Sequence, residues 1–261
     1  MSDSPMQDHP SFDAASFNAA AVYAGTVASA DMDVAPEPAT SETPKDIALH
    51  QRDELRTHFR MLLSRISNVA KSLGRPLQTI GITSCCRGEG VSAVTAGLAF
   101  EAARNQRVLF IDANCVNPSA HRIFGLSSET GLLQANNGDS RADQRVQSSS
   151  HSNLSVVVAG VPEDVNGDAH ISANKFDEFI TAVRNDFDLV FVDLPAVNSG
   201  GDTIDLAGLL DGIVLVVQAE RVPWQLAQKT QAILQEAGAQ LLGVAINQAP
   251  TRIPQWFDGE H

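Results

Sequence analysis

The chain has 261 residues, of which 43% are hydrophobic, enough for one large α/β domain or two small ones. The formal net charge of −13 argues against a nucleic-acid-binding surface, because phosphate contacts need clustered Lys and Arg. No apolar run approaches the roughly 20 residues that span a bilayer, and residues 1–10 lack the pattern of a secretory signal. Three cysteines make no disulfide framework, so we expect a cytoplasmic protein without direct membrane insertion.

The first part of the chain differs in composition from the rest. Residues 1–46 are rich in Ala, Ser, Asp and Pro and have no apolar periodicity, which predicts a disordered acidic N-terminal tail. A helix is predicted over residues 47–73, where apolar residues recur at spacings of three and four, and Gly74 and Pro76 predict its end. The residues of this apolar pattern are Leu55, Phe59, Leu62, Leu63, Ile66 and Val69.

Beyond residue 76, predicted strands and helices alternate. Strands are expected at 79–83, 108–112, 154–159, 189–193, 213–217 and 242–246, and helices at 92–105, 173–185, 203–210 and 224–237, with a polar loop at 134–152. The strands are short apolar runs rich in β-branched residues, which is typical of a parallel sheet covered on both faces. The alternation predicts an α/β fold with a doubly wound, mostly parallel sheet over residues 47–250. A short C-terminal tail is expected at 251–261.

A glycine-containing loop follows the first predicted strand and opens a helix. In the P-loop pattern G-x-x-x-x-G-K-[ST], Gly90 and Ser92 stand in place, whereas Val91 replaces the lysine and Cys85 the first glycine. Backbone N–H groups at a helix N-terminus bind phosphate without a lysine, although a tight turn capped by a serine would give the same pattern. The candidate cofactor-binding residues of the loop are Arg87, Gly88, Glu89, Gly90, Val91 and Ser92.

Two acidic residues end predicted strands of the same sheet. Asp112 ends the strand 108–112, and Asp193 ends the strand 189–193. Each alone could be a solvated strand end. Beside a phosphate loop, however, two such carboxylates favour a site that holds Mg²⁺ together with the Ser92 hydroxyl and orders a nucleophile. Asp112 and Asp193 are therefore the candidate catalytic residues, and Ser92, Asp112 and Asp193 the candidate metal ligands.

The order of several motifs resembles the bacterial tyrosine kinases (BY-kinases) of capsule and exopolysaccharide export, relatives of the MinD/ParA ATPases. The matching segments are GEGVS (88–92), IDAN (111–114), NPSAHRIFGL (117–126), DLVFVDLPA (188–196), DGIVLVV (211–217) and LGVAIN (242–247). The resemblance covers residues 54–248. It implies a MinD/ParA-like P-loop NTPase fold, ATP or ADP and Mg²⁺ as cofactors, and a position of Asn247 against the adenine.

The departures from the family pattern all weaken the expected chemistry. Val91 replaces the lysine, Asn114 replaces the second acid of the D-x-D motif, and Val116 stands at the following arginine position. Thr57 replaces the middle arginine of the subunit-contact motif E-x-x-R-x-x-R, so any homo-oligomer is expected to be weak. Residues 253–261 contain no tyrosine, whereas the family presents a C-terminal tyrosine cluster as its phosphorylation target.

These features lead to one main hypothesis and two alternatives. The main hypothesis is a BY-kinase-like regulatory adaptor of exopolysaccharide biosynthesis with impaired or no kinase activity. Its expected partner is a polysaccharide export or copolymerase membrane protein, which would recruit it to the inner face of the membrane. The alternatives are an active tyrosine kinase or ATPase that uses Arg87 for charge, and a MinD/ParA-like positioning ATPase. Cys85, Cys86 and Cys115 lack zinc spacing and are expected to be buried small residues rather than a redox or metal site.

Overall fold

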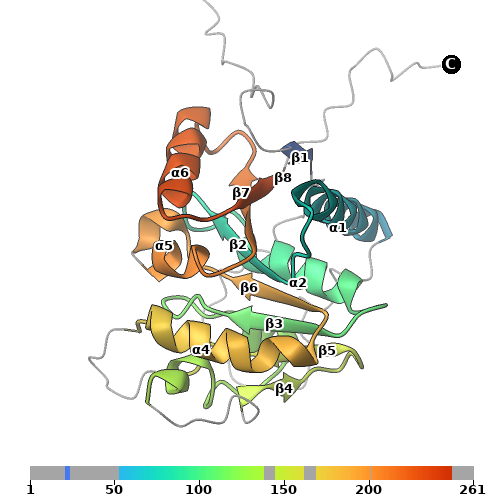
Figure 1. The fold of residues 1–261 in the computed structure, drawn as a ribbon, viewed down its shortest axis with the longest axis vertical. Coiled ribbons are helices and arrows are strands. Elements are labelled where there is room, and N and C mark those ends of the chain that lie inside the picture. The colour runs from blue at the N-terminus through green and yellow to red at the C-terminus, as the bar shows by residue number, and fades with distance from the viewer. Residues whose placement is uncertain (1–20, 24–52, 138–144, 162–168, 201, 249–261) are drawn as a thin grey trace, which may run out of the picture.

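The computed structural model of the protein describes residues 21–23, 53–137, 145–161, 169–200 and 202–248. Its centre is an eight-stranded sheet with the order β1-β8-β7-β2-β6-β3-β5-β4 (Figure 1). The strands are β1 (Ala21–Tyr23), β2 (Thr79–Ser84), β3 (Val108–Asp112), β4 (Gln147–Ser148), β5 (Leu154–Val157), β6 (Leu189–Asp193), β7 (Gly212–Gln218) and β8 (Leu241–Asn247). All neighbours pair in parallel except β4 and β5, which confirms the predicted doubly wound, mostly parallel sheet.

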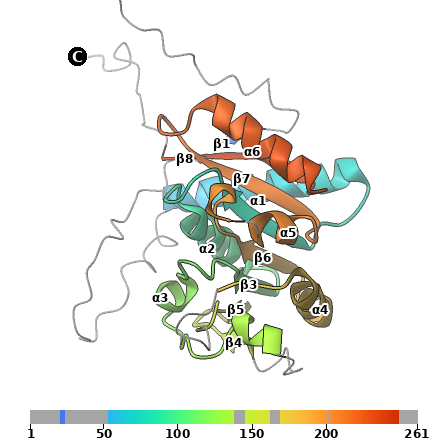
Figure 2. The same ribbon diagram turned by 90° about the vertical axis from the view of Figure 1, so that its left-hand side faces the viewer.

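Helices cover both faces of the sheet. They are α1 (Asp53–Leu73), α2 (Val91–Ala102), α3 (Ala120–Phe124), α4 (Ala173–Val183), α5 (Asp202–Ala207) and α6 (Trp224–Glu236). Apolar side chains of α1, α2 and α3 form one buried cluster with the sheet, and those of α4, α5 and α6 form the other on the opposite face (Figures 1 and 2). Helices α1 and α2 pack closely, because a Cβ atom on Gly97 would lie 2.1 Å from Cζ of Phe59.

Two segments differ from the sequence expectation. Residues 21–23, predicted to be disordered, pair in parallel with β8, where Tyr23 lies opposite Ile246. The edge of β8 offers unpaired backbone N–H and C=O groups, and these can order a short segment that has no apolar pattern of its own. The predicted loop 134–152 contains β4, which pairs antiparallel with β5. The rest of the predicted tail, the start of the first predicted helix at 47–52 and all residues from 249 onward lie outside the described residues.

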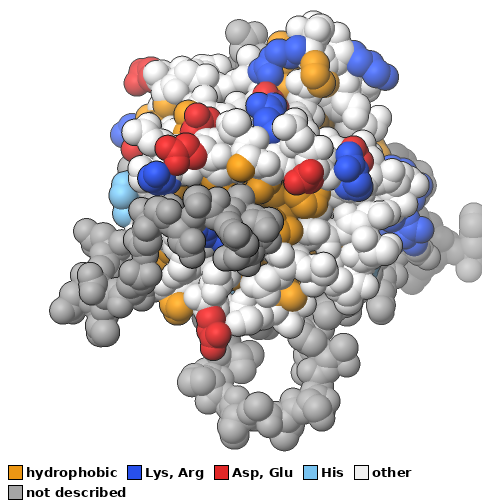
Figure 3. Space-filling view, turned by 60° about the horizontal axis from the view of Figure 1, so that its bottom comes forward, with side chains coloured by type: hydrophobic (Ala, Val, Ile, Leu, Met, Phe, Trp, Pro, Cys, Tyr) orange, Lys and Arg blue, Asp and Glu red, His pale blue; other side chains and the backbone are white. Residues whose placement is uncertain are grey.

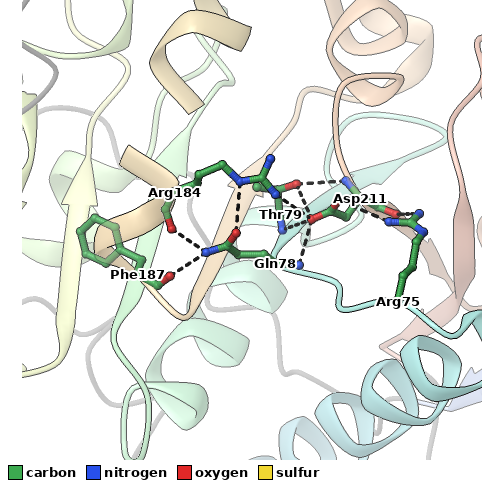
Figure 4. A network of polar contacts seen from close by, with 6 residues as sticks. All are labelled: Arg75, Gln78, Thr79, Arg184, Phe187 and Asp211. Carbon is green, nitrogen blue, oxygen red and sulfur yellow. Dashed lines mark hydrogen bonds and ion pairs between the residues drawn. The ribbon is translucent and has the colours of Figure 1, made fainter. Parts of the chain in front are cut away.

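A polar network joins the amino ends of β2 and β7, at the sheet edge opposite the glycine-containing loop (Figure 4). Oδ2 of Asp211 accepts hydrogen bonds from the backbone N–H groups of Gln78 and Thr79, both at 2.9 Å, and from the Thr79 hydroxyl at 3.1 Å. Arg75 pairs with Oδ1 at 3.3 Å. Burial raises the pKa of Asp211, but these hydrogen bonds and the nearby Arg184 outweigh it and hold the pKa below its usual value. The carboxylate thus fixes where the two strands begin.

We expect Asp211→Ala to lower the free energy of unfolding by about 2–3 kcal/mol at neutral pH, because two backbone N–H groups lose their acceptor. Since the folded-state pKa of Asp211 is depressed, this stabilisation is present above the unfolded pKa of about 3.9 and is lost as the pH falls through the folded value. Urea unfolding at pH 7 and near pH 3 measures it. The exposed Asp177→Ala is the control and should stay within about 0.5 kcal/mol of the parent protein. An equal effect of the two substitutions at pH 7 would contradict the role of Asp211.

Candidate functional site

The glycine-containing loop connects β2 to α2 at the carboxyl edge of the sheet, as predicted. Gly88 and Gly90 have φ angles of 84° and 86°, the left-handed region that glycine adopts without strain. A Cβ atom on Gly90 would lie 2.2 Å from Nδ2 of Asn247, so the loop lies directly against the end of β8. Within the described part of the chain, the N–H groups of Gly88 and Gly90 have no hydrogen-bond acceptor. They remain free to bind an anion at the start of α2.

A buried glutamate holds the loop in this shape. The Glu89 carboxylate accepts hydrogen bonds from the backbone N–H of Cys86 at 2.5 Å and of Gln218 at 3.2 Å, and the Asn247 side-chain amide donates to the Glu89 carbonyl at 2.9 Å. Burial raises the pKa of Glu89, while the two N–H donors and the nearby Arg221 oppose the rise. Glu89 therefore acts within the loop through its side chain, and only its backbone can face a ligand.

The two predicted carboxylates lie side by side at the ends of neighbouring strands. Asp112 and Asp193 are register partners in the parallel pair β3–β6, and both are fully buried. Oδ2 of Asp112 accepts from the N–H groups of Ser119 and Ala120, both at 2.8 Å, and Oδ1 accepts from Asn114 at 3.1 Å. Burial raises the pKa of Asp112 to about 6, although these three donors oppose the rise. The carboxylate of Asp112 thus anchors the start of α3.

Asp193 is equally buried but lacks the backbone hydrogen bonds that Asp112 accepts. Among the described residues, no hydrogen bond of ordinary geometry reaches either of its carboxylate oxygens, and the Ser92 hydroxyl is the one polar group near enough to act on it. Burial and the neighbouring Asp112 raise its pKa well above the usual value, and only the Ser92 hydroxyl, on the second residue of α2, opposes the rise. A buried carboxylate with two unused oxygens is costly unless it is protonated or coordinates a metal. Asp193 and Ser92 therefore fit a divalent cation, whereas Asp112 would have to give up backbone hydrogen bonds to join them.

The loop position that normally carries the lysine supplies no charge. Val91 is half-buried and packs against the apolar cluster beneath α1 and α2. Arg87, the substitute cation of one alternative hypothesis, is exposed and donates from Nε to Oγ of Ser199 at 3.1 Å. The guanidinium of Arg87 is thus directed toward the segment that follows β6.

The comparison with known proteins agrees with this architecture. The ParA family, described as NUBPL iron-transfer P-loop NTPase, matches residues 76–256. The chain belongs to the ParA family. Among curated relatives of this ParA-family protein, the tyrosine-protein kinase YwqD of Bacillus subtilis is 29% identical over 205 residues, which are 78% of this chain and 82% of YwqD.

Two further matches are a polysaccharide transport protein and a bacterial kinase domain. The succinoglycan biosynthesis transport protein ExoP of Rhizobium meliloti is 28% identical over 177 residues, which are 67% of this chain but only 22% of ExoP. The kinase domain of the Escherichia coli tyrosine kinase ETK superposes with a TM-score of 0.73 at 20% identity, and the match covers 92% of this chain and 95% of that domain, which shows the shared fold. The predicted relationship to bacterial tyrosine kinases is confirmed.

The three cysteines of the ParA-family chain are associated with one apolar cluster. Cys85 and Cys115 are buried in the cluster beneath α4, α5 and α6, and Cys86 is half-buried against it. Burial raises the pKa of the Cys85 thiol to about 12, and burial together with Asp112 also raises that of Cys115. The described residues contain no group of three or more His, Cys, Asp or Glu side chains that could hold a metal ion. Cys85 and Cys115 are therefore buried small residues, as predicted from the sequence.

The sequence analysis missed one cation beside the loop. Arg221, in the connection between β7 and α6, donates from Nη1 to the Gly88 carbonyl at 3.3 Å. The same nitrogen donates to Oε1 of Gln218 at 2.9 Å. Its position in the sequence could have identified it, because Arg221 follows β7 at the carboxyl edge, where a doubly wound sheet binds its ligands.

We expect Asp193→Asn to raise the melting temperature by about 2 °C or more at pH 7 in EDTA, because it removes the cost of keeping an ionisable carboxyl group buried at this pH. Because the folded-state pKa of Asp193 is raised, the buried carboxyl group destabilises the fold above its unfolded pKa of about 3.9 and not below it. The gain from Asp193→Asn should therefore disappear near pH 3. Thermal unfolding at both pH values measures the effect. The exposed Asp205→Asn is the control and should change little at either pH. A loss of stability at pH 7 would mean that Asp193 has a partner in the folded chain.

Proposed function

We propose that this ParA-family protein is a nucleotide-binding regulatory adaptor of exopolysaccharide biosynthesis in which phosphoryl transfer is impaired. One observation carries the proposal. Asp193 provides a buried carboxylate without an ordinary hydrogen bond, which would suit a metal ion, whereas the apolar Val91 stands at the position of the phosphate-clamping lysine.

The residues suit ATP or ADP with Mg²⁺. The N–H groups of Gly88 and Gly90 would bind phosphate oxygens, and Ser92 and Asp193 would hold the ion. The ion would supply positive charge that offsets part of the negative charge of the phosphates. Asn247 would border the base, since its side chain is buried against the loop at the end of β8. This assignment rests on the loop geometry and on the family, whose members have P-loops.

Phosphoryl transfer needs more positive charge than this site provides. Removal of one group that stabilises charge in the transition state typically costs on the order of 10²–10³ in rate. Val91 provides no such group, and Asp112, the second candidate for catalysis, already accepts three backbone hydrogen bonds. Binding of nucleotide would therefore persist while its turnover is slow.

A membrane transport protein of the same polysaccharide system is the proposed partner. ExoP, named as a succinoglycan biosynthesis transport protein, contains the matched segment as 22% of its length, which supports a transport protein of this kind as the partner. No helix of the described residues is long and apolar enough to cross a membrane, and recruitment to the inner face would come through this partner. On the face shown in Figure 3, acidic and basic side chains are interspersed, which suits a protein partner rather than a polyanion.

Self-association would be weak. Arg60, one of the two charged residues kept in the family's subunit-contact motif, donates from Nε to Oε1 of Glu101 on α2 at 3.2 Å within the same chain. Arg56 also pairs with Glu101, at 3.6 Å. Thr57, between them, has no charge with which to contact a neighbouring subunit. The adaptor is therefore proposed to act mainly through its membrane partner.

The wild-type protein is expected to hydrolyse ATP far below about 1 s⁻¹, the lower end of the kinase range. Val91→Lys should strengthen binding of a fluorescent ATP analogue by roughly 1–3 kcal/mol, the scale of a charge-assisted hydrogen bond. Phosphate-release assays and equilibrium titrations measure the two effects. Gln235→Lys, which adds the same charge at an exposed position of α6, is the control for net charge. A wild-type turnover of about 1 s⁻¹ or more would show that the protein is a working enzyme.

The adaptor role can be separated from a kinase role in the host. Deletion of the gene should reduce secreted polysaccharide and leave tyrosine phosphorylation of membrane proteins unchanged, because the proposed protein acts by association. Quantification of the polymer and phosphotyrosine mass spectrometry of the same cultures measure both. Loss of phosphotyrosine on deletion, with restoration by the wild-type gene, would support an active kinase instead.

A further inference from the structure

Arg221 contacts the glycine-containing loop but comes from a distant part of the sequence. Its Nη1 atom donates to the Gly88 carbonyl at 3.3 Å, and a Cβ atom on Gly88 would lie 3.2 Å from Nη1, 3.7 Å from Nη2 and 3.9 Å from Cζ. These distances place the guanidinium along the loop. Gln218, at the end of β7, receives the second hydrogen bond of Nη1, at 2.9 Å, and so holds the side chain in this position.

Most of the guanidinium remains available. In the part of the chain that the structure describes, Nη1 is the only nitrogen of Arg221 that donates a hydrogen bond. The Nε and Nη2 groups form the planar fork that binds phosphate oxygens in pairs. The side chain is exposed, so a ligand can reach it.

The backbone before Arg221 has an unusual conformation. Glu220 has a φ angle of 61°, which a residue with a side chain rarely adopts. Gln248, at the end of the neighbouring strand β8, has a φ angle of 54°. These are the only such non-glycine residues in the described part of the chain, and both follow strands that end beside the loop. Backbone strain of this kind is concentrated at binding sites.

The site needs an additional cation. Asp112, Glu89 and Asp193 are all buried around the loop, and a di- or triphosphate would add further negative charge. Arg122 acts electrostatically on Asp112, and Arg87 is bound to Ser199. Val91 contributes no charge. Arg221 is the cation that contacts the loop backbone and keeps free donors.

We propose that Arg221 binds the polyphosphate of a nucleoside di- or triphosphate and compensates in part for the missing loop lysine. The inference rests on the proposed nucleotide binding and adds a specific residue to it. Because Arg221 comes from the connection between β7 and α6, phosphate binding would also couple that connection to the loop. A cation in this position supports binding of the phosphates. It does not replace the contact that a lysine at position 91 would make with them.

Equilibrium titration with N-methylanthraniloyl-ADP in the presence of Mg²⁺ tests the proposal. Arg221→Gln should weaken binding about 10-fold or more, the scale of one charge-assisted hydrogen bond. Arg221→Lys should recover part of the loss, since it keeps the charge but not the fork. Lys229→Gln, which neutralises an exposed residue of α6, should stay within about twofold of the wild type, and Arg87→Gln should cost less than Arg221→Gln.

Competition with adenosine separates phosphate binding from a structural effect. Adenosine has no phosphate, so its affinity should be the same for the wild type and Arg221→Gln. An equal loss for adenosine and the labelled ADP would overturn the proposal, as would unchanged ADP binding by Arg221→Gln while the wild type binds. A wild-type protein that binds no labelled ADP would instead contradict the proposed nucleotide binding itself, and the role of Arg221 with it.

Discussion

The site depends on the enforced proximity of two buried carboxylates at the ends of β3 and β6. The parallel register places Asp112 and Asp193 side by side, and both are removed from water. Backbone donors from the start of α3 stabilise the first, whereas the second accepts no hydrogen bond of ordinary geometry from the described residues. An unpartnered buried carboxylate is expensive for a fold to keep. Its presence beside the loop is the strongest physical argument that this chain still binds a cation there.

The sheet could be predicted because most of its strands correspond to short, continuous apolar runs in the sequence. Strands β3 and β6 have the predicted bounds, and β7 and β8 each extend the prediction by one residue at either end. The site could be located for the same reason, since the residues that follow or end such strands in a doubly wound sheet meet at one edge. Asp193 and the loop are examples. The roles of the individual residues stay predictions, because an alternation of strands and helices says nothing about hydrogen bonds.

The features that could not be predicted depend on contacts between distant segments. Glu89 is a candidate cofactor-binding residue in the sequence, yet its carboxylate is buried and accepts a hydrogen bond from the N–H of Gln218 at the end of β7, 129 positions further along. Arg221 has no motif around it and is recognised only by its contact with Gly88. Strand β1 lies in a segment without apolar periodicity and pairs with the edge of β8. In each case a tertiary hydrogen bond overrides the local signal.

The central claim is that the site binds nucleotide through Mg²⁺ although it lacks the loop lysine. Isothermal titration calorimetry with a non-hydrolysable ATP analogue, in Mg²⁺ and then in EDTA, tests it most directly. The account predicts saturable binding to one site in Mg²⁺ and much weaker binding in EDTA, since Asp193 and Ser92 act through the ion. Absence of binding in Mg²⁺, or equal binding with and without the ion, would contradict the claim.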